Sequence, residues 1–230
     1  MMFYEIENLG GGENMYIELK DVTKEIKGTK VLDHVNCRFE SGNIYGLRGK
    51  NGSGKTMLMR AISGLIRIRT GVVDINGEIL GKDRTFPDSI GILIENPAFI
   101  DSYTGFKNLK VLASIRGKIN DEQIKSVLEE VGLFPDDKRT YRKYSLGMKQ
   151  RLGIAAAVME SPDIIILDEP INALDESGAK MVRTLLAKQK KRGAIIILAC
   201  HDTEELKFLA DVIYTISDGK VCISDNAVTL

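Results

Sequence analysis

The segment GKNGSGKT at residues 49–56 restricts the possible fold more than any other part of the sequence. It matches the pattern G-x-x-x-x-G-K-[ST], follows a short apolar stretch typical of a strand, and precedes apolar residues at helical spacing. Glycines allow a tight turn in which backbone N–H groups point at phosphate oxygens, and the start of the helix adds its positive dipole end. The segment therefore predicts a phosphate-binding loop, and its context disfavours a simple glycine-rich turn before a core helix.

Within this loop, Lys55 is expected to reach the β- and γ-phosphates of a nucleotide, and the Thr56 hydroxyl to bind Mg²⁺. The other loop residues expected to contact the nucleotide are Gly49, Asn51, Gly52, Ser53 and Gly54.

A second stretch, DIIILDEP at residues 163–170, places Asp168 and Glu169 at the end of a continuous apolar run. In open parallel sheets, ligands bind at the carboxyl ends of the strands. Asp168 suits the Mg²⁺ shell, usually through water, and Glu169 suits a base that orients and polarises the attacking water. Alone, this stretch could equally be a strand that ends in acidic loop residues, but beside a phosphate-binding loop it predicts nucleotide hydrolysis.

A third stretch, YSLGMKQRLGIAAAVM at residues 144–159, predicts a helix that begins near Leu146 with Ser145 as its cap. A capped helix start with a nearby basic side chain can form a second anion site. The segment alone is equally compatible with an ordinary capped core helix.

The remaining pattern is that of an α/β protein. Residues 15–26 and 30–39 alternate apolar and polar side chains like half-buried strands, and residues 71–80 predict a hairpin that turns at Asn76-Gly77. The runs DIIIL and AIIILAC predict parallel strands that are buried on both faces. The expected helices include an amphipathic pair between residues 97 and 152 and one that connects the two buried strands, and they lie at 105–117, 120–133 and 177–193.

The composition argues against several classes of protein. The 32 basic residues balance the 32 acidic residues, which argues against a nucleic acid partner. The longest apolar run is far shorter than the ~20 residues needed to span a bilayer. The cysteines Cys37, Cys200 and Cys222 form no CxxC pair, which favours buried thiols in a reducing cytoplasm.

The N-terminal stretch NLGGGENM suggests that Met15 is the natural start and that residues 1–14 are an added arm. Mass spectrometry of the native N-terminus tests this hypothesis, and a chain that starts at residue 1 or 2 would contradict it.

The order of these segments resembles that of ATP-binding-cassette ATPases, from about Tyr16 to Ile223. The resemblance implies a P-loop NTPase (RecA-like) fold, in which a parallel-sheet core carries an N-terminal antiparallel β subdomain and a helical insertion. On this basis, residues 15–230 form one ATPase domain. Its core is expected to comprise 15–95 and 153–230, with a helical subdomain at 96–152.

The resemblance also assigns roles to individual residues. The family signature is usually Leu-Ser-Gly-Gly-Gln. Here Ser145 and Gly147 are kept, whereas Tyr144, Leu146 and Met148 depart from it. In the family, two cassettes pack head to tail, so that the signature of one covers the γ-phosphate in the other. The resemblance therefore implies a second ATPase subunit as partner, either identical or different.

Four further positions follow from the resemblance. Asp175 in INALD resembles the family's D-loop near the dimer seam, and His201 resembles the switch histidine that contacts the γ-phosphate. Glu95 in ILIENPAFI stands where most relatives have Gln. It is expected to end a strand beside the phosphate-loop strand and to reach Mg²⁺ near Asp168. Ile26 occupies the usual place of the ring that stacks on adenine, which leaves nucleotide selectivity open.

ILIENPAFI and YSLGMKQRLGIA most resemble the ATPases of bacitracin-resistance and lantibiotic-immunity exporters in Gram-positive bacteria. The implied function is ATP hydrolysis that drives export of a peptide antibiotic or similar amphiphile through separate transmembrane permease subunits. The chain is then peripheral on the inner face of the membrane. Residues 96–112 are the expected wall of the permease groove. Taken one by one, its apolar residues are more safely interpreted as ordinary core, but as a patch the candidate contacts are Phe99, Ile100 and Tyr103.

Two alternatives stay open. One is an ATPase for another substrate class, such as a lipid or a drug. The other is a non-transport cassette of the kind used in translation or DNA repair. Such proteins usually carry two cassettes or long coiled coils in one chain, and this sequence shows neither.

Overall fold

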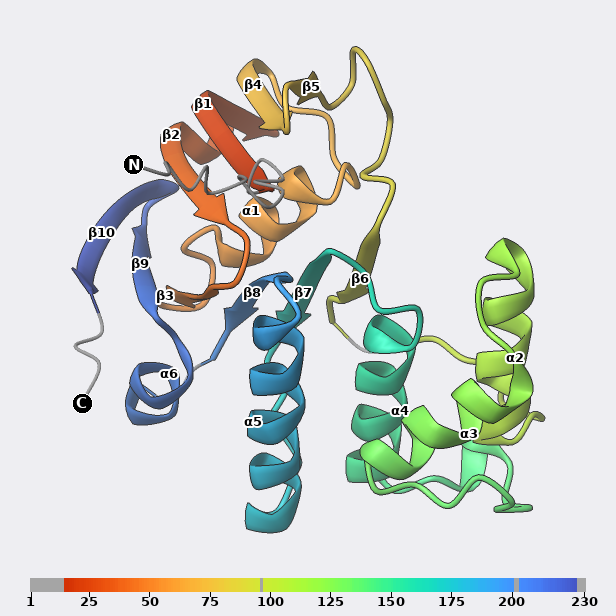
Figure 1. Cartoon of the computed structure of the whole chain (residues 1–230). Helices are drawn as coiled ribbons and strands as arrows, with labels where there is room; N and C mark the ends of the chain where they lie inside the picture. The colour runs from red at the N-terminus through yellow and green to blue at the C-terminus, as the bar shows by residue number, and fades with distance from the viewer. Residues whose placement is uncertain (1–14, 96, 201–202, 227–230) are drawn as a thin grey trace, which may run out of the picture.

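The computed structural model describes residues 15–95, 97–200 and 203–226, which form two β-sheets and the helices around them (Figure 1). One sheet has four strands in the order β2-β1-β4-β5, and the other has six in the order β10-β9-β3-β8-β7-β6.

The four-stranded sheet is the expected antiparallel region. Its strands are β1 (Tyr16–Ile26), β2 (Thr29–Glu40), β4 (Thr70–Ile75) and β5 (Glu78–Ile79). The alternation in β1 buries Ile17 and Leu19 on one face of the sheet. The predicted turn at Asn76-Gly77 is confirmed, because both residues have positive φ (52° and 86°), as a two-residue hairpin turn of this kind requires.

The six-stranded sheet forms the core of the chain. Its strands are β3 (Ile44–Arg48), β6 (Ile90–Leu93), β7 (Ile164–Asp168), β8 (Ile195–Ala199), β9 (Val212–Ser217) and β10 (Lys220–Asn226). All neighbouring pairs are parallel except β9 and β10. The phosphate loop after β3 and the carboxylates that end β7 therefore lie at the same edge of the sheet.

The expectation that the strand before Glu95 lies beside the phosphate-loop strand is wrong. β6 pairs with β7, and β7 and β8 stand between β6 and β3. The burial patterns give the reason. The apolar runs of β7 and β8 need cover on both faces, which only central positions provide, whereas the short β6 has two half-buried residues and takes the edge.

The described helices are α1 (Lys55–Ile62), α2 (Gly105–Arg116), α3 (Asp121–Glu130), α4 (Leu146–Val158), α5 (Glu176–Lys191) and α6 (Thr203–Leu209), with a 3₁₀ turn at Tyr141–Lys143. Four of the described helices, α2, α3, α4 and α5, begin at a residue whose side chain caps the helix. Asn120 caps α3 in a capping box with Gln123, and Ser145 caps α4 as predicted. The expected boundary between the helical subdomain and the core, between residues 152 and 153, falls inside α4.

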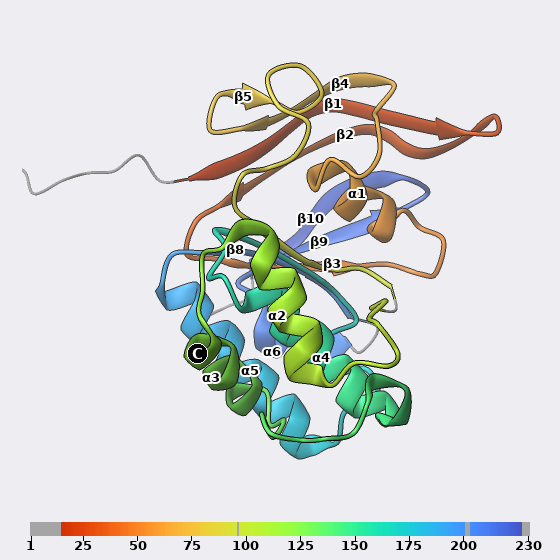
Figure 2. The same ribbon diagram turned by 90° about the vertical axis from the view of Figure 1, so that its right-hand side faces the viewer.

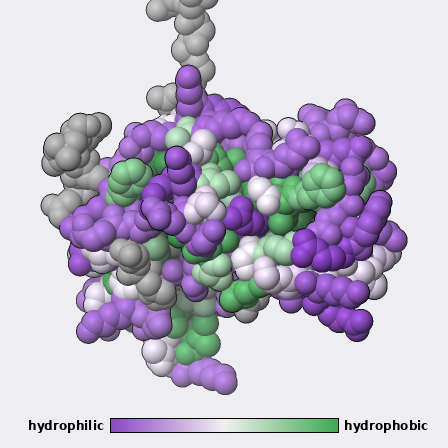
Figure 3. Space-filling view, turned by 90° about the horizontal axis from the view of Figure 1, so that it is seen from below, coloured by the Kyte–Doolittle hydropathy of each residue, from purple (hydrophilic) through white to green (hydrophobic). Residues whose placement is uncertain are grey.

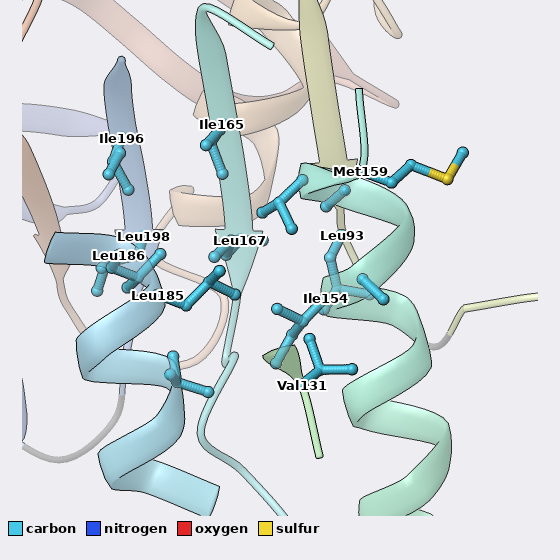
Figure 4. Packing of buried hydrophobic residues seen from close by; sticks show 14 of the residues in the cluster. Leu93, Val131, Ile154, Met159, Ile165, Leu167, Leu185, Leu186, Ile196 and Leu198 are labelled. Atoms are coloured by element: carbon cyan, nitrogen blue, oxygen red, sulfur yellow. The ribbon is translucent and has the colours of Figure 1, made fainter. Parts of the chain in front are cut away.

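The six-stranded sheet is covered on both faces, and Figure 2 shows the resulting layers. α1 lies between the two sheets, where Leu58 and Met59 pack in the same buried cluster as residues of β1, β2, β7 and β8. On the opposite face, α4 and α5 pack against β6, β7 and β8, and Figure 4 shows Ile154 and Leu185 pointing toward the strand residues Leu93 and Leu167. This packing fixes α1, β7 and α4 relative to one another.

Candidate nucleotide-binding site

The loop between β3 and α1 adopts a conformation that only glycine tolerates at a key point. Gly54, the N-cap of α1, has φ 116°, and a Cβ atom there would lie 2.7 Å from the Val31 carbonyl oxygen. A Cβ on Gly49 would meet the Ile216 carbonyl oxygen at 2.3 Å. Within the described residues no side chain caps α1 by a hydrogen bond, so its first backbone N–H groups lie free of side-chain partners at the loop.

Lys55 and Ser53 show that this loop suits an anion. The Lys55 ammonium donates to the carbonyl oxygens of Gly49 (2.6 Å) and Lys50 (3.1 Å), so it lies over the loop although its residue is only 7% exposed. The Ser53 hydroxyl oxygen is buried and has no hydrogen-bond partner among the described residues. A buried hydroxyl of this kind and a buried cation both gain from a phosphate oxygen beside them.

Thr56 and Asp168 form the second part of the site. The Thr56 hydroxyl donates to the Asp168 carboxylate across 3.1 Å, which joins the start of α1 to the end of β7. A hydroxyl and a carboxylate are hard oxygen ligands, and Mg²⁺ is usually held by one or two such protein groups together with substrate phosphates and water. The described residues contain no group of three or more His, Cys, Asp or Glu side chains that could hold a metal alone.

Glu169 follows Asp168 directly and has an unusual backbone. Its φ of 51° lies in the left-handed region, which costs free energy for a residue with a side chain. Its N–H donates to the Ala199 carbonyl oxygen at 3.0 Å, and its own carbonyl accepts from the Gln150 amide at 2.9 Å. The protein therefore fixes the Glu169 backbone from both sides.

A cavity of about 600 Å³ brings these elements together. Asn51, Gly52, Gly54, Lys55, Thr56, Met57, Asp168 and Glu169 line it, together with Ile26, Lys27, Thr29 and Val31 from the β1–β2 region. Ile26 is 41% exposed, and it lies at the position expected to meet a nucleotide base. Five of the seven predicted loop residues and the two carboxylates thus line one cavity, whereas Gly49 and Ser53 are not among its lining residues.

The signature residues lie elsewhere. Ser145 accepts a hydrogen bond from the Met148 N–H (3.2 Å) at the start of α4, and neither Ser145 nor Gly147 lines the cavity of its own chain. Asp175 caps α5 and is exposed. The Ser177 hydroxyl and the Gly178 N–H, which donate to its carboxylate, hold the pKa of Asp175 below its usual value.

Glu95 does not end its strand as expected, because β6 ends at Leu93 and Glu95 lies two residues farther on with φ 61°. Its carboxylate pairs with Arg60 in the last turn of α1, at 2.6 Å between Oε1 and Nη2, and is not among the groups that line the cavity. The predicted metal contact of Glu95 stays a prediction. His201 lies outside the described residues.

Three residues that contact the site residues were not predicted from the sequence. Arg60 pairs with Glu95, Gln150 binds the Glu169 carbonyl, and Arg151 lies 3.4 Å from the Asp175 carboxylate. Gln150 and Arg151 are polar residues that follow Lys149 immediately after the signature, before the apolar remainder of α4, and this position is the signal that could have drawn attention to them.

Comparisons with known proteins agree with this site. A family model described as ABC transporter matches residues 32–172. The chain is 46% identical to the uncharacterized ABC transporter ATP-binding protein YybJ of Bacillus subtilis, over 92% of this chain and 97% of that protein. It is 39% identical to the bacitracin transport ATP-binding protein BcrA of Enterococcus faecalis, over 88% of this chain and 67% of that protein.

Two solved structures have the same fold. The structure of an ATP-binding subunit of an ABC transporter matches with a TM-score of 0.82 and 27% identity, over 89% of this chain and 87% of the other. The dimeric post-hydrolysis structure of the ATP-binding cassette MJ0796 with ADP and Pi matches with a TM-score of 0.80 and 23% identity, over 93% of this chain and all of the other.

The chain therefore belongs to the ABC transporter family, and within that family it is an ATP-binding and ATP-hydrolysing subunit. Its fold is the α/β P-loop NTPase fold. In the parts of the chain that the structure describes, none of the helices has both the length and the apolar character needed to cross a bilayer.

Proposed function

We propose that this chain hydrolyses Mg²⁺-ATP in a head-to-tail dimer and thereby powers export of a peptide antibiotic or a similar amphiphile through separate permease subunits at the inner face of the membrane. The observation that carries the ATP-driven part is the meeting of the phosphate loop, the Thr56–Asp168 pair and Glu169 in one cavity. The substrate class rests on the likeness to the bacitracin transport protein.

In this proposal, each residue at the cavity has a separate role in ATP binding or hydrolysis. Lys55 exchanges its two carbonyl partners for phosphate oxygens, which are stronger acceptors for an ammonium. Thr56 and Asp168 would hold Mg²⁺, which would neutralise charge on the phosphates. Glu169, with its backbone fixed, orients the attacking water and accepts its proton.

The position of three residues outside the cavity of their own chain supports the proposed dimer. Ser145, Gly147 and Asp175 sit at the starts of α4 and α5, and none of them lines the cavity of its own chain. A second cassette packed head to tail would bring Ser145 and Gly147 to the γ-phosphate of this chain's nucleotide. The dimeric cassette with the same fold provides a precedent.

The exposed apolar residues of the proposed permease-docking surface differ in part from the candidates named from the sequence. Phe99 packs edge-on against Tyr141 (5.2 Å between ring centroids) and belongs to the helical core, whereas Ile100 is 45% exposed. Outward-facing apolar side chains continue on α2 at Val111, Leu112 and Ile115. Figure 3 shows such apolar areas among polar side chains on one face of the molecule. Ile100 and the α2 residues suit a helix from a membrane subunit.

Susceptibility assays with the native host test the proposal. Loss of the chain should lower the concentration of a peptide antibiotic that inhibits growth. The wild-type gene should restore resistance, and Glu169→Gln should not. An Ile115→Lys variant should also fail to restore resistance while its purified ATPase activity stays intact, because it disrupts only the docking surface. Unchanged susceptibility to every peptide antibiotic tested would favour a lipid or drug substrate instead.

A further inference from the structure

The signature helix α4 is bonded directly to the segment that carries Glu169. The Gln150 side chain, in the second turn of α4, donates from Nε2 to the carbonyl oxygens of Glu169 (2.9 Å) and Pro170 (3.2 Å). One amide group thus bridges two successive carbonyls, and only a side chain with N–H donors can do so. The bridge joins the helical region to the end of β7.

Two more residues of α4, Arg151 and Gly147, lie close to the same segment. Arg151 Nη2 lies 3.4 Å from the Asp175 carboxylate, while its Nη1 donates to the Val131 carbonyl oxygen, outside the segment, at 2.9 Å. At the start of the helix, a Cβ on Gly147 would lie only 3.0 Å from the Ala173 carbonyl oxygen, so α4 passes close to this backbone. The contacts span the whole stretch from Glu169 to Asp175.

The attached segment has a strained backbone at two residues. Glu169 (φ 51°) and Ala173 (φ 65°) both occupy the left-handed region. Residues in this region keep their conformation only where neighbouring groups hold them, and Gln150 holds the carbonyl of Glu169 while Ala199 holds its N–H. The direction of the Glu169 side chain therefore depends on where Gln150 is.

We propose that Gln150 is a positioning residue that couples the two nucleotide sites of the dimer. This inference rests on the proposed function, because Ser145 and Gly147 serve the partner's nucleotide whereas Glu169 serves the chain's own. When the start of α4 settles on the partner's γ-phosphate, Gln150 sets the Glu169 backbone for hydrolysis. Arg151 lies on the same helix, so it moves with Gln150 and keeps its contact with Asp175 during this movement.

Steady-state kinetics of Gln150→Met test the role, because methionine keeps the length of the side chain and removes both donors. The turnover number should fall roughly 10- to 100-fold, the loss expected when a catalytic group is misplaced by about 1 Å. The KM for ATP and the melting temperature should stay at the wild-type values, since Gln150 does not line the cavity. Gln150→Glu should be at least as slow, because its carboxylate would face two carbonyl oxygens.

Lys149→Met is the matched control. Lys149 precedes Gln150 on α4, but its ammonium lies over the Tyr141 ring, 5.0 Å from the ring centroid, rather than on the Glu169 segment. The turnover number of Lys149→Met should therefore match that of the wild type. Equal turnover in Gln150→Met and Lys149→Met would overturn the coupling role, as would a Gln150→Met loss that appears only as a higher KM or a lower melting temperature.

Light scattering with ATP distinguishes a failure of the proposed dimer from a failure of the coupling role of Gln150. Because hydrolysis would release the dimer, the comparison uses Glu169→Gln with and without Gln150→Met, and both should form dimers in Mg²⁺-ATP. A Glu169→Gln chain that stays monomeric under these conditions would overturn the proposed dimer and the coupling with it. A normal dimer in which Gln150→Met turns over at the wild-type rate would overturn the coupling alone.

Discussion

Arg60 Nη2 and Glu95 Oε1 lie 2.6 Å apart, and this ion pair ties the last turn of α1 to the segment that leads into the helical region. Its side chains are 30% and 63% exposed, so the pair contributes only about 0–1 kcal/mol. A pair this weak can exchange partners readily. We propose that the charge of Glu95 alternates between Arg60 and Mg²⁺, which a neutral glutamine at this position could not do.

If Glu95 exchanges Arg60 for Mg²⁺, Arg60→Met should lower the Mg²⁺ concentration that half-saturates ATP hydrolysis by up to about fivefold, the equivalent of ~1 kcal/mol. Glu95→Gln should impair substrate transport more than ATP binding. Arg67→Met, an exposed arginine beyond α1, is the control. Identical Mg²⁺ titrations for Arg60→Met and Arg67→Met would remove Glu95 from the metal site.

Ser145→Arg should block ATP turnover by more than tenfold and leave ATP binding to the single chain unchanged. The reason is that Ser145 lies outside its own cavity, and a bulky cation there would obstruct the seam with a partner. Fluorescent-nucleotide titration and phosphate release measure the two effects separately. Unimpaired turnover would argue against head-to-tail packing.

Asn108→Leu should destabilise the helical region. The Asn108 side chain is 3% exposed, accepts from the Ile100 N–H (2.8 Å), and donates to the carbonyls of Ile100 (3.2 Å) and Thr104 (3.1 Å). Its loss leaves buried backbone groups unsatisfied at about 1–3 kcal/mol. Thermal unfolding should show a melting temperature lower by about 2–4 °C per kcal/mol. Ser114→Ala on the exposed face of α2 should leave it unchanged.

Cys222 should react with a thiol reagent in the folded protein at pH 8, and Cys37 should not. Burial raises the pKa of the Cys37 thiol to about 12, so almost none of it is thiolate at this pH, whereas Cys222 is exposed. In Cys222→Ser the fast reaction should vanish and return only after unfolding in denaturant. A fast reaction that survives Cys222→Ser would show that a cysteine described as buried is accessible.

Local features of this chain could be predicted from the sequence. The phosphate loop, the Asn76-Gly77 turn and the Ser145 cap each depend on a few neighbouring residues, and the structure has all three. The continuous apolar runs of β7 and β8 likewise identified two strands buried on both faces.

Long-range features could not be predicted from local pattern alone. Apolar alternation shows which residues face the core but not which strand pairs with which, so the separation of β6 from β3 was missed. The contacts of Arg60 with Glu95 and of Gln150 with Glu169 join residues 35 and 19 positions apart, and nothing in either local sequence specifies the partner. Phe99 was named as a candidate docking contact with ordinary core as the alternative, because a short apolar run does not show how far each residue packs inward, and Phe99 is partly buried against the helical core.

The most direct test of the central claim is ATP turnover and ATP-dependent dimerisation of Glu169→Gln measured side by side. The claim is that Glu169, fixed at the end of β7 beside the Thr56–Asp168 pair, is the base for hydrolysis. Glu169→Gln should bind ATP with wild-type affinity, release no phosphate above background, and accumulate as a stable dimer. Phosphate release near the wild-type rate would contradict the claim.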